Sequence, residues 1–341
     1  MFSCPHYLRN IATAFFLCLL STSSFADDLF DMLKRMSDAD QNQNYQGTFI
    51  LRKSDNLSTL RVTHGVDDKG VWETLEALNG ESRKVFRHNN LVISVFPSRE
   101  LVTIRHSSKK QSLHQQLPDN IDQLEQFYSM KRLADDRIAN HQTLVVDLLP
   151  KDQFRYGYRY WVDKNTGMLL RCDLVDEDKV VVEQMMFTSL DYLQTVPEKT
   201  FELQNFEKFE QQQLDEPELD MKQQADTGWK VGHLPKGFML TQSTMRHSQP
   251  SSDAGRQPSA ASLPEDLPLD LLHLVYSDGL ASVSVFIETN QGAGKHLQGG
   301  ASMGAVNAYG NAMNGYFATV VGEVPAKTVQ LMAKSLVKLP Q

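Results

Sequence analysis

Cysteine is nearly absent from this chain of 341 residues. It occurs only as Cys4, Cys18 and Cys172, and the first two lie in an apolar N-terminal segment. Once that segment is removed, Cys172 alone remains and no intramolecular disulfide can form. Because Cys172 lies in the apolar stretch 168–175, it is predicted to be a buried structural thiol. Stability must therefore come from hydrophobic cores.

Apolar runs of membrane-spanning length are also missing. Residues 11–20 form an apolar run interrupted by Thr13, about half of the roughly twenty residues that a transmembrane helix needs. Arg9 precedes this run, and small and polar residues follow it up to Ala26. This order is typical of a secretory signal. It predicts a signal peptide over 1–26, cleaved after Ala26, and a secreted mature protein.

The chain has no excess of positive charge. It carries 42 acidic and 34 basic residues, a net charge of −8. Phosphate backbones are bound by clustered Lys and Arg, so nucleic acid is not an expected partner. General adsorption to an anionic membrane is disfavoured for the same reason.

Residue patterns that would signal catalysis or metal binding are missing as well. No two of the histidines after the signal are three to five residues apart, the spacing of helical metal pairs. Gly294-Lys295-His296 lacks the upstream Gly of a phosphate loop. The sequence therefore predicts no catalytic residues, no metal, no cofactor and no enzyme activity.

What is present is a series of short β-strands. After a helix predicted over 27–39, apolar residues alternate with polar ones in segments about ten residues apart, with Asn, Gly, Asp or Pro between them. A second helix is predicted over 121–130, where apolar residues have helical spacing. The strands are expected at 45–52, 57–66, 71–78, 83–87, 91–96, 101–106, 142–149, 156–162, 168–175 and 180–190.

The composition changes after residue 204. Residues 205–227 are rich in acidic residues and Gln and are predicted to be a linker between a domain over 27–204 and a smaller one over 228–341. Within the second domain, 248–268 is rich in Ser and Pro and is expected to be a mobile loop. A last helix is predicted after Pro325. Strands are expected at 238–245, 271–276, 281–288, 305–313 and 316–321.

A meander with helices against one face can form an open barrel with an apolar inner face. Such a face can take an acyl chain or an apolar peptide. The alternative, favoured for any single residue, is that these side chains are ordinary core. The candidate pocket residues are Phe49, Leu51, Leu60, Val62, Trp72, Phe86, Val92, Val95, Phe127, Tyr160 and Phe187.

Several segments resemble the MucB/RseB family of sigma-E factor regulatory proteins. They follow one another in order along nearly the whole chain after the signal. The most specific are 152–163 (DQFRYGYRYWVD) and 276–288 (YSDGLASVSVFIE). Others are 45–49 (YQGTF), 304–309 (GAVNAY) and 315–325 (GYFATVVGEVP). The loop 248–268 departs most from the family pattern.

The resemblance implies a mainly β (α+β) protein. Its N-terminal domain would be an unclosed antiparallel barrel similar to the lipoprotein carriers LolA and LolB, with packed helices, and its C-terminal domain a smaller α+β unit. It implies a periplasmic negative regulator that binds the periplasmic domain of an RseA-like anti-sigma factor. Bound there, it would hinder site-1 cleavage by a DegS-like protease until lipopolysaccharide or a mislocalised lipoprotein releases it.

The second domain is the expected main contact with that partner, through Tyr276, Phe286, Tyr309, Tyr316 and Phe317. Aromatic residues on strands are more often core, so this assignment competes with a structural one. The sequence leaves two other functions open: a lipid or lipoprotein carrier of the LolA type, and an envelope assembly factor. It also leaves open a homo-oligomer.

Overall fold

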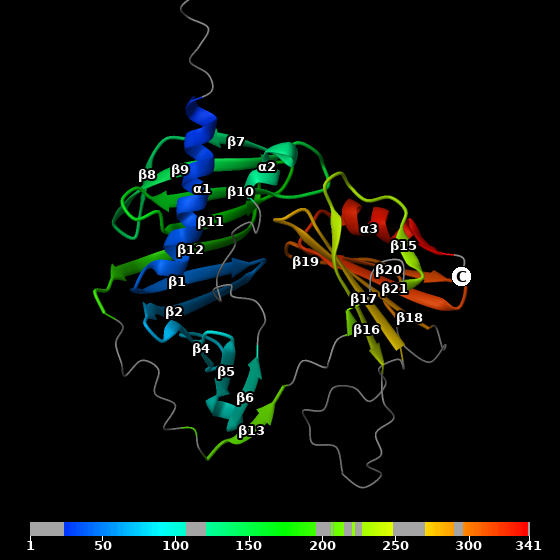
Figure 1. The fold of residues 1–341 in the computed structure, drawn as a ribbon, viewed down its shortest axis with the longest axis horizontal. Helices are drawn as coiled ribbons and strands as arrows, with labels where there is room; N and C mark the ends of the chain where they lie inside the picture. The colour runs from blue at the N-terminus through cyan, green and yellow to red at the C-terminus, as the bar shows by residue number, and fades with distance from the viewer. Residues whose placement is uncertain are drawn as a thin grey trace, which may run out of the picture.

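The structure is a computed structural model that describes residues 24–106, 121–195, 206, 208–214, 220–221, 227–247, 270–289 and 296–339. It contains two large β-sheets in two lobes (Figure 1). Most of the predicted signal and the whole predicted loop 248–268 lie outside the described residues. In the described ranges, no helix combines the length and the apolar character needed to cross a membrane.

The first sheet is an antiparallel meander. Its strands follow the order β13-β6-β5-β4-β3-β2-β1-β12-β11-β10-β9-β7, with β8 paired to β9 and β13 parallel to β6. Its ends, β13 and β7, are not paired with each other, so the barrel is open. The strands are β1 (Tyr45–Lys53), β2 (Asn56–Asp67), β3 (Gly70–Ala77), β4 (Lys84–His88), β5 (Leu91–Phe96), β6 (Leu101–His106), β7 (Tyr128–Arg132), β8 (Asp136–Ile138), β9 (His141–Pro150), β10 (Gly157–Asp163), β11 (Leu169–Val175), β12 (Val181–Tyr192) and β13 (Glu210–Gln213). A 3-10 turn (Pro97–Arg99) joins β5 to β6.

Aspartate and glycine residues set the tight turns of this sheet. In the β2–β3 turn, Oδ1 of Asp67 accepts hydrogen bonds from the backbone N–H groups of Lys69 (2.8 Å) and Gly70 (3.1 Å). Gly70 has a φ of +125° there, a conformation that side chains disfavour. The turn residues seen in the sequence therefore fix the strand register by local hydrogen bonds.

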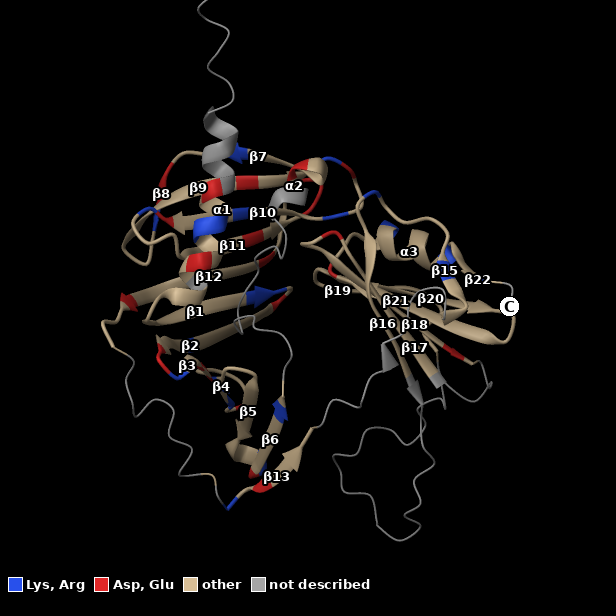
Figure 2. Ribbon diagram, in the orientation of Figure 1, with Lys and Arg blue, Asp and Glu red and all other residues tan. Residues whose placement is uncertain are grey.

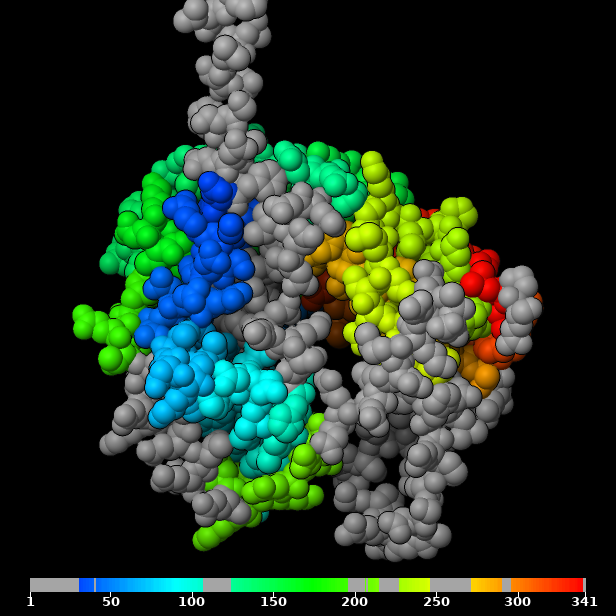
Figure 3. All heavy atoms as spheres, in the orientation of Figure 1, coloured from blue at the N-terminus to red at the C-terminus, as the bar shows by residue number. Residues whose placement is uncertain are grey.

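Helix α1 (Ser24–Asn42) lies across the concave face of the first sheet, beside α2 (Ile121–Phe127). It forms a blue ridge on the surface of this lobe (Figure 3). Met32, Leu33 and Met36 follow helical spacing and are at most 3% exposed. They form one core with buried side chains of β1, β2, β9, β10, β11 and β12. The helix is thus held by its apolar stripe.

A smaller cluster lies on the opposite face of the same sheet. Phe86, Val95 and Val102 are buried there, and Phe206 and Phe209 pack against them. Strand β13 then adds to the sheet edge beside β6. The chain that leaves the first domain therefore crosses its convex face before it reaches the second sheet.

The second sheet has the order β14-β16-β17-β18-β21-β20-β19, and helix α3 (Ala326–Lys334) lies against β20 and β21. A separate core of Leu274, Tyr276, Val285, Val320 and Met332 fills the space between them. Strands β15 and β22 form a two-stranded sheet beside it. The strands are β14 (Asp220–Met221), β15 (Trp229–Val231), β16 (Met239–His247), β17 (Asp270–Ser277), β18 (Ser282–Thr289), β19 (Gly299–Met303), β20 (Val306–Met313), β21 (Tyr316–Gly322) and β22 (Leu336–Lys338).

The predicted mainly β class, with an unclosed first sheet and a smaller second sheet, is confirmed. The helix predicted over 121–130 ends at Phe127, because Tyr128–Arg132 pairs with β9 as β7. The segment 205–227, predicted as a linker, gives an edge strand to each sheet, β13 and β14.

Candidate functional site: the interdomain junction and the hollow beside α1

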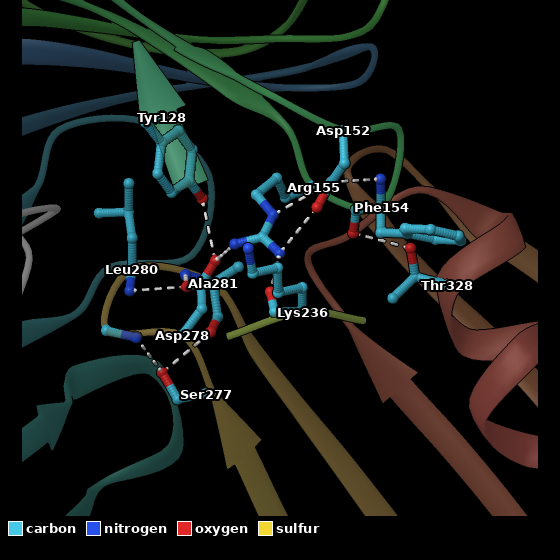
Figure 4. Close-up of polar contacts among 11 residues, drawn as sticks. Tyr128, Asp152, Phe154, Arg155, Lys236, Ser277, Asp278, Leu280, Ala281 and Thr328 are labelled. Atoms are coloured by element: carbon cyan, nitrogen blue, oxygen red, sulfur yellow. Dashed lines mark hydrogen bonds and ion pairs between the residues drawn. The ribbon is translucent and has the colours of Figure 1, made fainter. Parts of the chain in front are cut away.

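The two sheets meet where the loop 151–156, between β9 and β10, contacts the turn between β17 and β18. This contact surface is called the interdomain junction (Figure 4). Its two sides are the segments 152–163 and 276–288 that carried the family resemblance most specifically. Residues far apart in the chain are thereby placed in direct contact.

Arg155 is the centre of the junction. Its side chain is 0% exposed, and Nη1 donates to Oδ2 of Asp278, also 0% exposed, at 2.5 Å. Nη2 donates to Oδ2 of Asp152 (3.0 Å) and to the carbonyl oxygen of Lys236 (2.6 Å). The guanidinium also lies 5.1–5.6 Å from the ring centroids of Phe127, Tyr128 and Phe238. Because its charge is desolvated, these contacts are what make its burial tolerable.

Asp278 uses both of its carboxylate oxygens. Oδ1 accepts from the backbone N–H groups of Leu280 (2.9 Å) and Ala281 (2.7 Å), which shapes the β17–β18 turn. Oδ2 accepts from Arg155 and from the hydroxyl of Tyr128 at 3.3 Å. Burial, reinforced by the nearby Asp278 charge, raises the pKa of Tyr128 well above its usual value. Tyr128 therefore stays a neutral donor to Asp278.

A second set of buried contacts lies beside this ion pair. Nδ2 of Asn307 donates to the hydroxyl of Tyr156 (3.0 Å) and to the carbonyl oxygen of Val324 (2.8 Å). Oγ1 of Thr328, at the start of α3, donates to the carbonyl oxygen of Phe154 at 2.7 Å. The junction thus engages β20 and α3 as well as the β17–β18 turn.

Exposed ion pairs line the margin of the junction. Nζ of Lys327 lies 2.6 Å from Glu177 and Nζ of Lys53 lies 3.4 Å from Glu323, and all four side chains are 35–65% exposed. Such exposed pairs each stabilise by about 0–1 kcal/mol. Orientation of the two domains therefore depends mainly on the buried contacts.

The predicted pocket residues are divided between the two faces of the first sheet. Register places Phe49, Leu51, Leu60, Val62, Val92, Tyr160 and Phe187 on the face that α1 covers, where Phe127 of α2 joins them. Trp72, Phe86 and Val95 lie on the opposite face. Trp72 stacks on His88 with 3.6 Å between ring centroids. One pocket can therefore include at most the first eight, and of these all except Leu51 are less than 10% exposed.

Two hollows instead lie beside α1, near the turn between β10 and β11. The first, called the α1 hollow, has a volume of about 210 Å³ and is lined by Met32, Arg35, Arg132, Leu144, Val162, Asp163, Lys164 and Gly167. The second has about 250 Å³ and shares Arg35 and Gly167 with the first. None of the eleven predicted pocket residues lines either one.

The five predicted partner-contact residues are not on one surface. Tyr276, Tyr309 and Tyr316 lie on the face of the second sheet that α3 covers, whereas Phe286 and Phe317 lie on the other face. Tyr276 and Phe317 are at most 1% exposed. Half-buried Phe286 stacks on His273, with 4.3 Å between ring centroids.

Sequence reasoning did not single out Arg155 or Asp278. Both lie inside the quoted resemblance segments, which is the one signal that pointed to them. Among the described residues, no three His, Cys, Asp or Glu side chains are grouped so that they could hold a metal ion.

The fold and the junction define a two-domain, mainly β protein whose halves are held together by buried polar contacts. A sequence profile of the MucB/RseB N-terminal domain matches residues 28–211, and one of the MucB/RseB C-terminal domain matches 223–337. The chain therefore belongs to the MucB/RseB family, and the resemblance seen in the sequence is confirmed.

Relatives match over almost their whole length. The sigma factor AlgU regulatory protein MucB of Pseudomonas aeruginosa is 29% identical over 324 residues, covering 91% of each chain. The sigma-E factor regulatory protein RseB of Haemophilus influenzae is 25% identical over 332 residues, covering 93% of this chain and 94% of the relative. A chain in the solved complex of Pseudomonas aeruginosa MucA/MucB superimposes with a TM-score of 0.69 at 26% identity, covering 92% of this chain and 100% of that chain.

Proposed function

We propose that this protein is a periplasmic negative regulator of the sigma-E envelope stress response. It binds the periplasmic domain of an anti-sigma factor similar to MucA or RseA and protects it from site-1 cleavage by a DegS-like protease. Binding of lipopolysaccharide or of lipoprotein acyl chains releases the partner. It is not an enzyme. Its domains are 27–204 and 228–341, joined by 205–227.

The observation that carries this proposal is the similarity across both domains to a chain of the MucA/MucB complex, with a TM-score of 0.69. A carrier of the LolA type would need the first domain alone. The second domain and its buried junction to the first through Arg155 and Asp278 therefore favour a regulator over a carrier.

The periplasmic location rests on the N-terminal pattern. The run 11–20, followed by small residues up to Ala26, fits a signal peptide cleaved after Ala26. A single buried cysteine, Cys172, suits an oxidising compartment because it has no intramolecular partner and is shielded from intermolecular ones.

For a lipid to release the anti-sigma factor, the two ligands must either bind different conformations of this protein or compete for one of its surfaces. The coupling is reciprocal, so a lipid that weakens partner binding a hundredfold is itself bound about a hundredfold more weakly by the complex. That factor corresponds to about 2.7 kcal/mol, which burial of a few methylene groups can supply.

The main partner contact is in the second domain, where half-buried Phe286 is the best placed of the five candidate aromatic residues.

The direct test is calorimetric titration of residues 27–341 with the periplasmic segment of the host's anti-sigma factor, with and without lipopolysaccharide. We expect micromolar or tighter binding that lipopolysaccharide weakens. A Phe286→Ala variant should bind the segment more weakly, while Trp72→Ala, on the convex face of the other domain, should bind as the unaltered protein does. Lipid binding without any binding of the segment would favour the carrier.

A further inference from the structure

Helix α1 and the β10–β11 turn approach each other closely at Arg35 and Gly167, which line both hollows. Gly167 in this turn has a φ of +80°, and a Cβ there would lie 3.1 Å from the carbonyl oxygen of Arg35. The first hollow opens toward Met32 and the second toward Ala39 and Asn42. The two hollows therefore share the basic residue Arg35 at their common border.

The α1 hollow has an apolar inner part. Met32 and Val162 are 3% and 2% exposed and belong to the main core of the first domain, and half-buried Leu144 packs against that core. Met32 and Val162 expose almost no surface to water, so a hydrocarbon chain entering here would mainly cover the exposed part of Leu144. Apolar contact of this kind favours binding in proportion to the area that is buried.

The rim of the same hollow is basic. Arg35, Arg132 and Lys164 line it, against a single carboxylate, Asp163. This local excess of positive charge occurs in a chain whose net charge is −8. Arg35 belongs to the basic Lys34-Arg35 pair of α1, which acidic residues flank along the helix (Figure 2).

Asp163 already has hydrogen-bond partners among its own neighbours. Its Oδ1 accepts from the backbone N–H of Asn165 (2.7 Å), and its Oδ2 accepts from the hydroxyl of Tyr192 (3.1 Å) and lies 3.0 Å from Nδ1 of His141. It does not need the rim cations. Its side chain is 1% exposed, and its carboxylate is the one negative charge in the lining, against three rim cations.

Asp135 offsets part of the rim charge from outside the hollow. It lies 2.5 Å from Nζ of Lys164 and 3.3 Å from Nη2 of Arg132. All three side chains are 36–48% exposed, and exposed pairs of this kind are weak. A bound anion could therefore share these cations. The second hollow differs, because there Arg35 faces the carboxylate of Asp38.

We infer that the α1 hollow binds a single-chain anionic amphiphile. Its hydrocarbon chain contacts Met32, Leu144 and Val162, and its carboxylate or phosphate group lies among Arg35, Arg132 and Lys164. Binding at this site is a property of the first domain alone; its meaning as a release signal rests on the proposed function.

The test uses residues 27–341 and three probes of equal chain length: dodecanoate, dodecyl phosphate and dodecanol, each below its micellar concentration. We expect the two anionic probes to bind at least about tenfold more tightly than dodecanol, since charge-assisted contacts are stronger than neutral ones. A difference between dodecanoate and dodecyl phosphate would show whether a fatty acid or a phosphorylated lipid is the better ligand.

Variants that remove rim charges test whether the probes bind in the α1 hollow or elsewhere in the first domain. The double variant Arg35→Gln/Arg132→Gln should lose about tenfold in affinity for the anionic probes and keep its affinity for dodecanol. Arg61→Gln is the matched control, because Arg61 is an exposed arginine paired with Glu76 at 3.0 Å on the convex face.

A second variant fills the α1 hollow with a larger side chain. Leu144→Trp should weaken the binding of all three probes while the circular dichroism spectrum stays unchanged. Equal affinity for charged and neutral probes, or unchanged anion affinity in the double variant, would overturn the inference. Failure to bind the anti-sigma segment would instead count against the proposed function, because no lipid probe depends on that segment.

Discussion

At the scale of single residues, Cys172 shows what burial does to reactivity. Its side chain is 1% exposed on β11, and this burial raises the pKa of the thiol well above its usual value. The thiolate, which is the nucleophile, is therefore scarce at neutral pH. In residues 27–341, where Cys172 is the single thiol, we expect Ellman's reagent to react only after denaturation in guanidinium. Rapid release of the coloured product from the native protein would contradict this.

The burial of Cys172 was predictable from its apolar neighbours and is confirmed. Arg155 was not predictable in the same way. An arginine in a loop, three residues after Asp152, is expected to be exposed, and the residue that makes its burial tolerable, Asp278, is 123 positions away. A pairing over that separation leaves no periodicity or spacing in the sequence, so the junction needed the fold to reveal it.

Asp136 on β8 provides a test of acid sensitivity at one carboxylate. The backbone N–H of Arg137 (2.8 Å) and then Nε1 of Trp161 (2.9 Å) donate to it, and these hydrogen bonds lower its pKa below 3.8. The folded pKa is below the unfolded one, so the stabilisation is present above pH 3.8 and is lost as the pH falls through the folded pKa. We expect the Tm of Asp136→Asn to fall less than that of the unaltered protein below about pH 4.

The comparison for this prediction is Asp55→Asn, at an exposed position of the β1–β2 turn. Thermal unfolding followed by circular dichroism at a series of pH values gives each Tm. The Asp55→Asn curve should stay parallel to that of the unaltered protein. If the Asp136→Asn curve is parallel too, the hydrogen bonds to Asp136 do not stabilise the fold.

At the scale of elements, Gly237 is where the segment between β15 and β16 passes α2. Its φ is +93°, and a Cβ there would lie 2.5 Å from Cζ of Phe127. We expect Gly237→Ala to lower the free energy of unfolding by more than the 1–2 kcal/mol or so that the left-handed conformation alone costs. Gly315→Ala is the matched control, since its φ is +82° and no atom lies within 4 Å. Urea unfolding measures both, and equal losses would show that the contact with Phe127 is unimportant.

Most strands of both sheets lie within a few residues of their predicted bounds, because alternation and turn residues are local signals. The face that a strand turns toward α1 was harder to predict. In β4, Val85, Phe86 and Arg87 are all buried, so burial does not alternate and the sequence cannot show which side chain is on which face. The polar strand β13 was missed because it has no apolar face and joins the sheet through its backbone.

At the scale of the whole molecule, two separate hydrophobic cores are joined by a junction that is largely polar. The first core contains Met36 and Tyr160, and the second contains Tyr276 and Met332. The Arg155–Asp278 pair lies between them, with both side chains 0% exposed. Two cores that could each unfold alone become one cooperative unit only if their contact is strong enough.

Cooperativity between the domains should therefore depend on this pair. Removing one partner of a buried ion pair leaves the other charge uncompensated and costs about 3–5 kcal/mol. We expect differential scanning calorimetry to give one transition for residues 27–341 and two for Arg155→Met. Lys327→Met should keep one transition, because the Lys327–Glu177 pair is exposed and contributes about 1 kcal/mol or less.

The double variant Arg155→Met/Asp278→Leu distinguishes loss of an attraction from exposure of an unpaired charge. Replacing both members of a buried pair by apolar side chains is often close to neutral, so this variant should regain much of the single transition. Two transitions in the unaltered protein would mean that the junction does not couple the domains. One transition in all variants would mean that Asn307, Thr328 and the apolar contacts couple the two domains without the ion pair.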